Sequence, residues 1–415
     1  MNTSIYLHIP FCKHRCAYCD FNTYAGQEDS IPGYVDVLIK EINFIGYQTA
    51  KLSDNPSIHT IFFGGGTPSL LSAPQFDSIL RALRSAFTLT ADAEISIEAN
   101  PGTISPEQLN AIRKSGINRI SFGVQSTNTE ELRMLERIHD FFTVIESVSA
   151  ARKAGFDNLN LDLIYGLPEQ TVASWKTTLF RIVDLHPEHI SAYALTLEHG
   201  TPFGRWSSKG LLPLPDPDLA ADMYEYAEEF LEESGYAHYE ISNWALDQGP
   251  KTKDHQSSTS VFGPPSHACK HNLQYWRSLP YLAFGAGAHG YMNGYRYSNA
   301  LRIKTYIDRL TTPQFTNLPF PLSPATVNQH KQTQQDDISD YMINNLRLTN
   351  AGVAESDFRS RFGRGLFDVY PKEIEELVRN GLLEKKTSEV SETSEVYRLT
   401  KRGRLLGNQV FVRFV

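Results

Sequence analysis

Several kinds of feature are scarce in this chain of 415 residues, and each scarcity excludes a class of protein. Only 4 cysteines are present, far fewer than a disulfide-stabilised secreted domain contains. No apolar run approaches the roughly 20 residues that a membrane-spanning helix needs. The net charge of -8 provides no basic surface for nucleic acid. The start, MNTSIYLHIP, lacks the charged and apolar regions of a signal peptide, so we expect a cytoplasmic protein.

Three of the four cysteines lie close together near the start of the chain. Cys12, Cys16 and Cys19 form a C-x3-C-x2-C pattern, and thiolates in so tight a group are typical ligands of a metal or an iron–sulfur cluster. A [4Fe–4S] cube needs four ligands, so three cysteines leave one iron open for a small molecule to chelate. Zinc is the alternative, with His8 or His14 completing a Cys3His site.

The first 195 residues alternate between strand-like apolar runs and helical patterns. The predicted strands are 4–9, 58–63, 94–98, 119–123, 158–163 and 189–195. The predicted helices include 34–45, 76–87 and a helix that Ser105 caps. Six strand–loop–helix units predict an α/β fold with a parallel sheet curved as an open, partial (β/α)6 barrel. Ligands bind such folds at the carboxyl ends of the strands.

The rest of the chain is predicted to form smaller parts. We expect a barrel core of residues 1–246, which ends with a helix at 216–234 and one strand at 236–244. A polar, mobile insertion at 247–267 and a connecting region at 268–323 are expected to follow it. Residues 324–415 are predicted to be a mainly helical, winged-helix-like module, and 324–337 to be its polar link or the start of its first helix. Residues 350–415 carry 12 Lys and Arg against 10 Asp and Glu, which favours partner docking over DNA binding.

Polar and glycine residues follow several predicted strands. The run 64–68, GGGTP, lacks the pattern of a P-loop, but glycines there would let the backbone approach a ligand closely. Glu98, Gln125 and Asp162 stand at strand ends, and Arg137 follows one of them. Any one of these side chains is more often solvated or structural. Because the first three share a position at the strand ends, we expect them to converge on a polar ligand.

The stretch KHNLQYWR holds a second candidate site, composed of His271, Asn272, Tyr275 and Trp276. It follows the fourth cysteine and precedes 284–291, FGAGAHGY, which is interpreted as a glycine-rich apolar turn with another histidine. Imidazole is a common protein ligand of haem iron, and aromatic rings can face a porphyrin plane. The alternative is a packed, half-exposed edge of the protein without a ligand.

Taken together, the motifs resemble those of the radical S-adenosylmethionine (SAM) superfamily. The cysteine pattern with its Tyr-x-His-Ile-Pro-Phe lead-in, the GGGTP run and the later GVQS and DLIYGLP segments are similar to the branch that contains oxygen-independent coproporphyrinogen III oxidase and the HemW haem chaperones. The resemblance implies that Cys12, Cys16 and Cys19 hold a [4Fe–4S] cluster whose open iron is chelated by SAM. The residues it places near this cofactor are Tyr6, Gly65, Gly66, Thr67, Glu98, Gln125, Arg137 and Asp162.

Three departures from the oxidase pattern favour the haem-carrier side of this branch. Phe21 stands where the oxidase has a fourth cysteine, only residues 1–3 precede the first strand, and His271 begins an HNxxYW motif that is associated with haem binding in the HemW group. The resemblance therefore implies a haem chaperone with haem, haem-acceptor proteins, a flavodoxin or ferredoxin electron donor and a transiently contacted membrane protein as partners. The alternatives are a coproporphyrinogen oxidase and a winged-helix DNA-binding sensor.

Overall fold

The computed structural model describes residues 2–52, 56–247, 264–312, 318–387 and 395–415. The chain divides into two compact units. The first is Met1–Tyr224 with Pro280–Lys331, and the second is Glu225–Leu279 with Gln332–Val415. The predicted insertion at 247–267 falls largely outside the described residues, and the domain boundaries drawn from the sequence at 246, 267 and 323 stay predictions.

Six parallel strands form the centre of the first unit, which confirms the predicted partial (β/α)6 barrel. In sheet order they are β1 (Asn2–Ile9), β4 (Ser57–Gly65), β5 (Thr88–Ala99), β6 (Arg119–Gln125), β7 (Leu159–Tyr165) and β8 (His189–Ala194). Each neighbouring pair in this row runs parallel. Parallel sheets need cover on their faces, and the crossover helices supply it.

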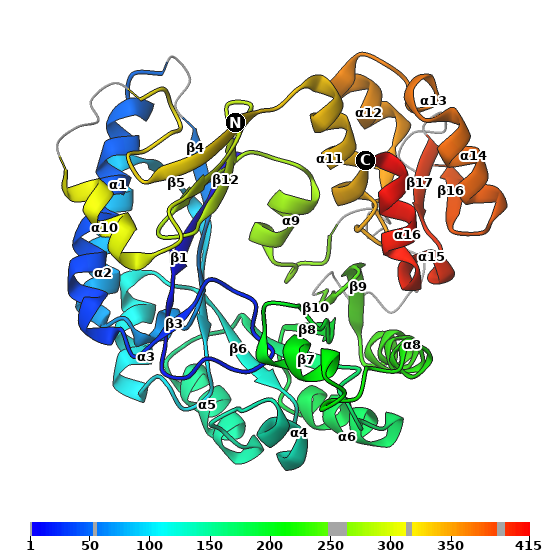
Figure 1. The fold of residues 1–415 in the computed structure, drawn as a ribbon, viewed down its shortest axis with the longest axis horizontal. Helices are drawn as coiled ribbons and strands as arrows, with labels where there is room; N and C mark the ends of the chain where they lie inside the picture. The colour runs from blue at the N-terminus through cyan, green and yellow to red at the C-terminus, as the bar shows by residue number, and fades with distance from the viewer. Residues whose placement is uncertain (1, 53–55, 248–263, 313–317, 388–394) are drawn as a thin grey trace, which may run out of the picture. The chain divides into compact units, whose positions relative to one another are not determined.

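The crossover helices pack along the outside of this sheet. They are α1 (Ile31–Thr49), α2 (Ala73–Ala86), α3 (Pro106–Ser115), α4 (Thr129–Met134), α5 (Phe141–Lys153) and α6 (Val172–Val183). Figure 1 shows α1, α2, α3 and α5 in a row outside the strands. The predicted cap of α3 is confirmed, because Ser105 accepts a hydrogen bond from the Gln108 backbone N–H.

Strand alternation gives the sheet an apolar outer face and a polar inner face. Along β5, Ile95 and Ile97 are buried on one side, whereas Ser96 and Glu98 point to the other because successive side chains alternate. On β7, Asn160 and Asp162 share the polar side in the same way. The interior of the barrel is therefore lined with groups that can bind a polar ligand.

A second, antiparallel part of the sheet extends beyond β1, and the sequence analysis missed it. β11 (Tyr281–Phe284) lies parallel to β1, and β12 (His289–Met292), β13 (Tyr295–Asn299) and β14 (Thr326–Lys331) continue the sheet antiparallel, with α10 (Ile303–Thr311) inserted before β14. The prediction of a turn over 284–291 is wrong at its end, where β12 begins. The prediction of a link or helix start over 324–337 is wrong where β14 forms.

The second unit contains the predicted winged-helix arrangement. Its elements from residue 334 are α11 (Gln334–Asn345), β15 (Val353–Ala354), α12 (Glu355–Phe362), α13 (Leu366–Val369), α14 (Pro371–Arg379), β16 (Leu383–Thr387), β17 (Glu395–Leu399), α15 (Lys401–Leu405) and α16 (Gly407–Phe411). The three strands form a small sheet in the order β15-β17-β16. Met342, Phe358, Leu366 and Leu399 belong to one buried cluster that joins the helices to this sheet.

The second unit has two strands where the sequence predicted a single one. After α8 (Pro217–Glu233), β9 (Tyr236–Glu240) and β10 (Asn243–Leu246) pair antiparallel, so the prediction of a single strand over 236–244 is wrong. The Glu240 carboxylate accepts the Ser242 backbone N–H at 3.0 Å and thereby stabilises the tight turn. Across the described parts of the chain, we find no helix with the length and apolar character to span a membrane.

Candidate cofactor site

A cavity of about 380 Å³ lies at the carboxyl ends of the parallel strands in the first unit. All but one of the residues that the resemblance places at the cluster or SAM line it. They are Cys12, Cys16, Cys19, Gly65, Gly66, Thr67, Glu98, Gln125, Arg137 and Asp162. The exception is Tyr6, which lies on β1 beside Gly64. The fold thus brings together residues that are separated by up to about 150 positions in the sequence.

Short backbone contacts close the cysteine loop at its base. β2 (Phe11–Cys12) pairs with β3 (Tyr24–Ala25), and the Tyr24 N–H donates to the Pro10 carbonyl at 2.7 Å. The Thr67 N–H donates to the Phe11 carbonyl at 2.7 Å, which ties the loop to the glycine run. The three cysteines therefore sit on a loop whose two ends are fixed to each other and to the end of β4.

A polar partner lies beside each of the three sulfurs. Thr67 Oγ1 donates to Cys12 Sγ at 3.6 Å, and Arg137 Nη1 donates to Cys16 Sγ at 3.5 Å. Cys19 Sγ lies 4.0 Å from Thr23 Oγ1. Burial raises the pKa of the Cys12 and Cys19 thiols, which disfavours free thiolates, so these neighbours are needed to stabilise the charged sulfurs that metal binding requires.

The residues around the sulfurs fit a cluster with an open corner. Three thiols face one cavity, and each has its own hydrogen-bonding neighbour. His8 and His14 are occupied elsewhere, since His8 bonds to Tyr6 and His14 pairs with Glu136 at 3.1 Å. Neither histidine completes the Cys3His set that was the zinc alternative.

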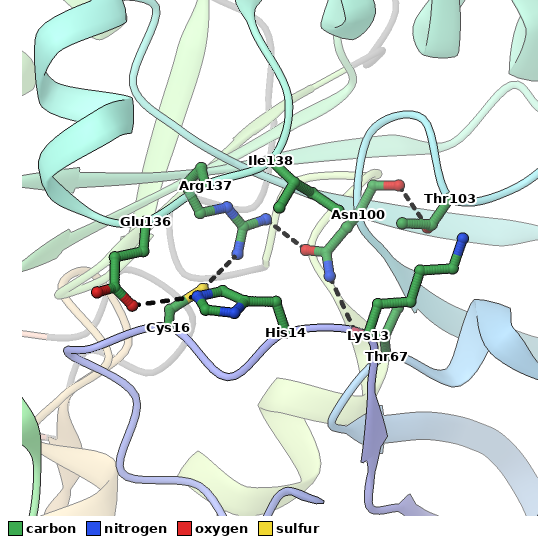
Figure 2. A pocket seen from close by; sticks show the side chains of 9 residues that line it. All are labelled: Lys13, His14, Cys16, Thr67, Asn100, Thr103, Glu136, Arg137 and Ile138. Atoms are coloured by element: carbon green, nitrogen blue, oxygen red, sulfur yellow. Dashed lines mark hydrogen bonds and ion pairs between the residues drawn. The ribbon is translucent and has the colours of Figure 1, made fainter. Parts of the chain in front are cut away.

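Arg137 links the cysteine loop to the ends of two strands, and Figure 2 shows its contacts with Cys16 and Asn100. Its Nη2 donates to the Gly123 carbonyl at 2.7 Å and to Asn100 Oδ1, and Asn100 Nδ2 donates to Thr67 Oγ1 at 2.9 Å. The Nε of Arg137 is buried and has no partner among the described residues. A buried donor without a partner at a cavity wall is costly, which indicates that a ligand acceptor belongs there.

Glu98 and Asp162 form a close pair of carboxyl groups inside the cavity. Glu98 Oε2 accepts the Gly65 N–H at 3.0 Å, and Asp162 accepts the Ser121 hydroxyl at 2.6 Å. Burial, followed by the charge of Asp162, raises the pKa of Glu98 to about 8. Burial also raises the pKa of Asp162. Strongly shifted carboxyl groups in a cavity are typical of functional sites, because a bound cation can compensate the unfavourable charge.

The glycine loop can be formed only by residues without a side chain. Gly65 has φ of +113°, and a Cβ there would lie 2.5 Å from the His8 ring. A Cβ on Gly66 would lie 2.6 Å from the Phe11 carbonyl oxygen. The His8 Nε2–H donates to the Asn22 carbonyl at 2.9 Å, so its Nδ1 accepts the Tyr6 hydroxyl at 2.9 Å. Tyr6 thus supports the loop through His8, although it does not itself line the cavity.

The HNxxYW residues lie together on α9 (Lys270–Trp276) in the second unit. His271 is only 1% exposed, and its Nε2 lies 2.8 Å from the Tyr275 hydroxyl. Trp276 stacks beneath the Arg347 guanidinium, 4.3 Å from ring centroid to Cζ. Asn272 is half-buried on the same helix. In this structure the histidine is therefore packed inside its own unit rather than open to a ligand.

Comparisons with known proteins agree with this geometry. Residues 6–182 match the radical SAM superfamily, and residues 332–406 match the HemN C-terminal domain. The chain is 36% identical over 413 residues to the heme chaperone HemW of Bacillus subtilis, covering 99% of each chain. It is 32% identical over 418 residues to the heme chaperone HemW of Escherichia coli, covering 99% of this chain and 98% of that protein. The chain belongs to the HemW family.

A solved structure supports the fold of this HemW-family chain along its whole length. The coproporphyrinogen III oxidase HemN from Escherichia coli, a radical SAM enzyme, matches with a TM-score of 0.77 at 25% identity and covers 99% of this chain and 89% of that one. Phe21, the position that the sequence resemblance singled out as a departure from the oxidase pattern, is 69% exposed and lines the cavity.

Sequence reasoning missed several residues that shape the cavity of this HemW-family chain. Asn100 bridges Arg137 and Thr67, and Ser121 holds Asp162. The position of polar residues at the parallel strands could have indicated both, since Asn100 comes directly after β5 and Ser121 lies on the inner face of β6. Residues 193–196, at the end of β8 and just beyond it, also line the cavity, which the strand-end rule could have indicated.

Proposed function

We propose that this protein is a cytoplasmic haem chaperone that binds a [4Fe–4S] cluster, SAM and haem and transfers haem to acceptor proteins. The observation that carries the proposal is the single cavity where three thiols, a glycine loop and a buried carboxyl pair meet, in a chain that aligns end to end with relatives named heme chaperone HemW. We propose that its partners also include a flavodoxin or ferredoxin and a membrane protein contacted transiently.

Within the proposal, Cys12, Cys16 and Cys19 hold the cluster, which when reduced supplies an electron for cleavage of SAM. Glu98 and the Gly65–Gly66 backbone bind the amino and carboxylate end of SAM. A positive amino group beside Glu98 offsets the burial and the Asp162 charge that raise the Glu98 pKa, so ligand binding favours the charged carboxylates. Arg137 holds the Cys16 sulfur and the Asn100 amide in place. Gln125, with φ of +70°, is kept strained at the end of β6.

The haem contacts are proposed from the HNxxYW motif. His271, Asn272, Tyr275 and Trp276 are the proposed haem-binding residues, and α9 must change its packing for the buried His271 ring to reach iron. A histidine ring that leaves the Tyr275 hydroxyl loses one hydrogen bond, worth about 1 kcal/mol, which iron ligation can offset. We propose the motif as the site from which haem is handed on.

The test is anaerobic reconstitution followed by haem titration. The reconstituted protein is expected to develop a Soret band on haem addition, to pass haem to the apo form of a soluble haem protein, and to lose affinity on His271→Ala. Absence of a Soret band, or haem that never leaves for an acceptor, would contradict the proposal. Anaerobic turnover of coproporphyrinogen III to protoporphyrinogen would favour the oxidase instead. An assay for 5′-deoxyadenosine decides whether SAM is cleaved.

A further inference from the structure

A second cavity, of about 320 Å³, lies in the first unit on the antiparallel extension of the sheet. It is formed by β12, β13 and β14 and by the start of α10. The lining residues that matter here are His289, Leu301, Arg302, Thr305, Val327 and Asn328. Its volume falls within the range of small-molecule sites in proteins. None of the proposed cluster, SAM or HNxxYW residues lines it.

The charge of this cavity favours an anion. None of the described residues that line it is an aspartate or a glutamate. The Arg302 side chain is exposed and makes no hydrogen bond or ion pair with the described part of the chain. Arg302 is also the N-cap residue of α10, and that end of the helix has no side-chain cap. A free guanidinium beside uncapped backbone N–H groups is a suitable partner for a carboxylate.

The cavity also presents an unengaged imidazole. His289 begins β12, opposite Ser298 on β13, and its ring is exposed. No described residue forms a hydrogen bond, an ion pair or a ring contact with it. By contrast, the His271 ring is buried, with only 1% of the residue exposed, and it contacts the Tyr275 hydroxyl. An accessible imidazole nitrogen is a common ligand of haem iron.

Apolar side chains flank these two polar groups. Leu301 is 57% exposed and Val327 is 46% exposed, and both line the cavity. Exposed aliphatic side chains beside a free cation suit a ligand that has an apolar body and an acidic edge. A carboxylate, an apolar body and a metal that accepts imidazole are combined in an iron porphyrin.

The rim of this cavity is joined to the cysteine loop. Asn22 Nδ2 donates to the Leu301 carbonyl at 3.0 Å and to the Ala286 carbonyl at 3.1 Å, and the Tyr24 hydroxyl donates to the Leu301 carbonyl at 3.2 Å. Asn22 and Tyr24 follow Cys19 by only a few residues. The segment that carries Leu301 and Arg302 is therefore braced by the loop that would hold the cluster.

We propose that the cavity between His289 and Arg302 takes the carboxylate-bearing edge of haem, with Arg302 pairing a propionate and His289 facing the iron. This inference rests on the proposed function and adds a haem contact outside the HNxxYW motif. An open site with few contacts binds haem reversibly, as transfer to an acceptor requires.

Three porphyrins separate the two contacts in the full-length, reconstituted protein. Haem has both iron and carboxylates, metal-free protoporphyrin IX has only the carboxylates, and haem dimethyl ester has only the iron. Arg302→Gln is expected to weaken binding of the first two by about tenfold and to leave the ester unchanged. His289→Gln is expected to weaken haem and the ester by about tenfold, to shift the Soret band, and to leave the metal-free porphyrin unchanged.

Matched controls are available on α10 and β14. Lys304→Gln removes an exposed cation from the same helix, and His330→Gln removes an exposed histidine from β14; neither residue lines the cavity. Both controls are expected to bind all three porphyrins like the wild type. If the wild type binds haem while the Arg302 and His289 variants match it with every porphyrin, this inference is overturned and the proposed function stands. A wild type that binds no haem overturns both.

Discussion

Replacing Glu98 with glutamine is expected to stabilise the cluster-free protein at alkaline pH. Glu98 lies in the inner wall of the cofactor cavity, where burial and the Asp162 charge raise its pKa from an ordinary 4.5 to about 8. A carboxyl group whose pKa is higher in the folded state binds its proton more tightly there. The contribution of Glu98 to the free energy of unfolding is therefore fully present below pH 4.5 and is lost as the pH rises towards 8.

The size of the effect follows from this shift. Of the range from pH 6 to pH 9, about two pH units lie below the pKa of Glu98 in the folded protein. Over those two units the free energy of unfolding falls by about 3 kcal/mol. Because Glu98 faces a cavity that water can enter, we take about 1–3 kcal/mol as the expected range. For a unit of this size that is a fall in Tm of roughly 5 °C. The glutamine variant keeps an acceptor for the Gly65 N–H and has no carboxyl proton to lose.

The assay is thermal unfolding of the cluster-free protein at pH 6 and pH 9, followed by circular dichroism. The difference in Tm between the two pH values is expected to be smaller in Glu98→Gln than in the wild type. Glu130→Gln, which removes an exposed carboxylate paired with Arg133, is the control and should behave like the wild type. Parallel losses in wild type and Glu98→Gln would refute the reasoning. The variant should also bind SAM more weakly, because the site loses a negative charge.

Three further changes test other parts of the first unit. Cys16→Ala is expected to abolish retention of cluster iron after anaerobic reconstitution, measured as iron per chain, whereas Cys269→Ala should retain it. Glu41→Ala should lower the free energy of unfolding by about 3 kcal/mol or more, because the buried carboxylate accepts four hydrogen bonds from the segment 285–323. Tyr34→Phe should cost about 1–2 kcal/mol, since its hydroxyl donates to the buried His8 carbonyl at 2.7 Å. Denaturant unfolding measures both.

Each of these predictions has an outcome that contradicts it. Iron retained at the wild-type level in Cys16→Ala would remove that cysteine from the ligand set. A Glu41→Ala protein as stable as the wild type would mean that its hydrogen bonds contribute no net stability. An unchanged free energy of unfolding in Tyr34→Phe would mean that the hydrogen bond of the Tyr34 hydroxyl contributes no net stability. Tyr24→Phe removes a hydroxyl that bonds to an exposed carbonyl, and it serves as the tyrosine control with a smaller expected effect.

The local pattern of the sequence was sufficient for the regular elements. The helix predicted over 76–87 was found as α2 (Ala73–Ala86), because its apolar residues recur at helical spacing. The Ser105 cap and the six parallel strands were predicted for the same kind of reason. Glu98, Gln125 and Asp162 were placed correctly at one cavity, since parallel strands end on one side of a sheet.

Contacts between distant segments could not be predicted in this way. β14 reads as polar and lies at the outer edge of the sheet, so it has no apolar alternation to reveal it. The bonds from Arg137 to Asn100 and Cys16 join three segments whose proximity depends on how the loops pack. Tyr6 was assigned to the cofactor from the resemblance, and that role stays a prediction, because its ring shares the inner face of β1 with His8 but does not line the cavity.

The sequence by itself determined the chemistry of this protein: three thiols in one loop, glycines beside them, and carboxyl groups at strand ends. Residue type and spacing along the chain set those features directly. Only the tertiary structure decided which side chains share a cavity, which carboxyl pKa rises, and that His289 is open while His271 is packed. Burial and electrostatic coupling depend on distances through space, and these exist only once the chain has folded.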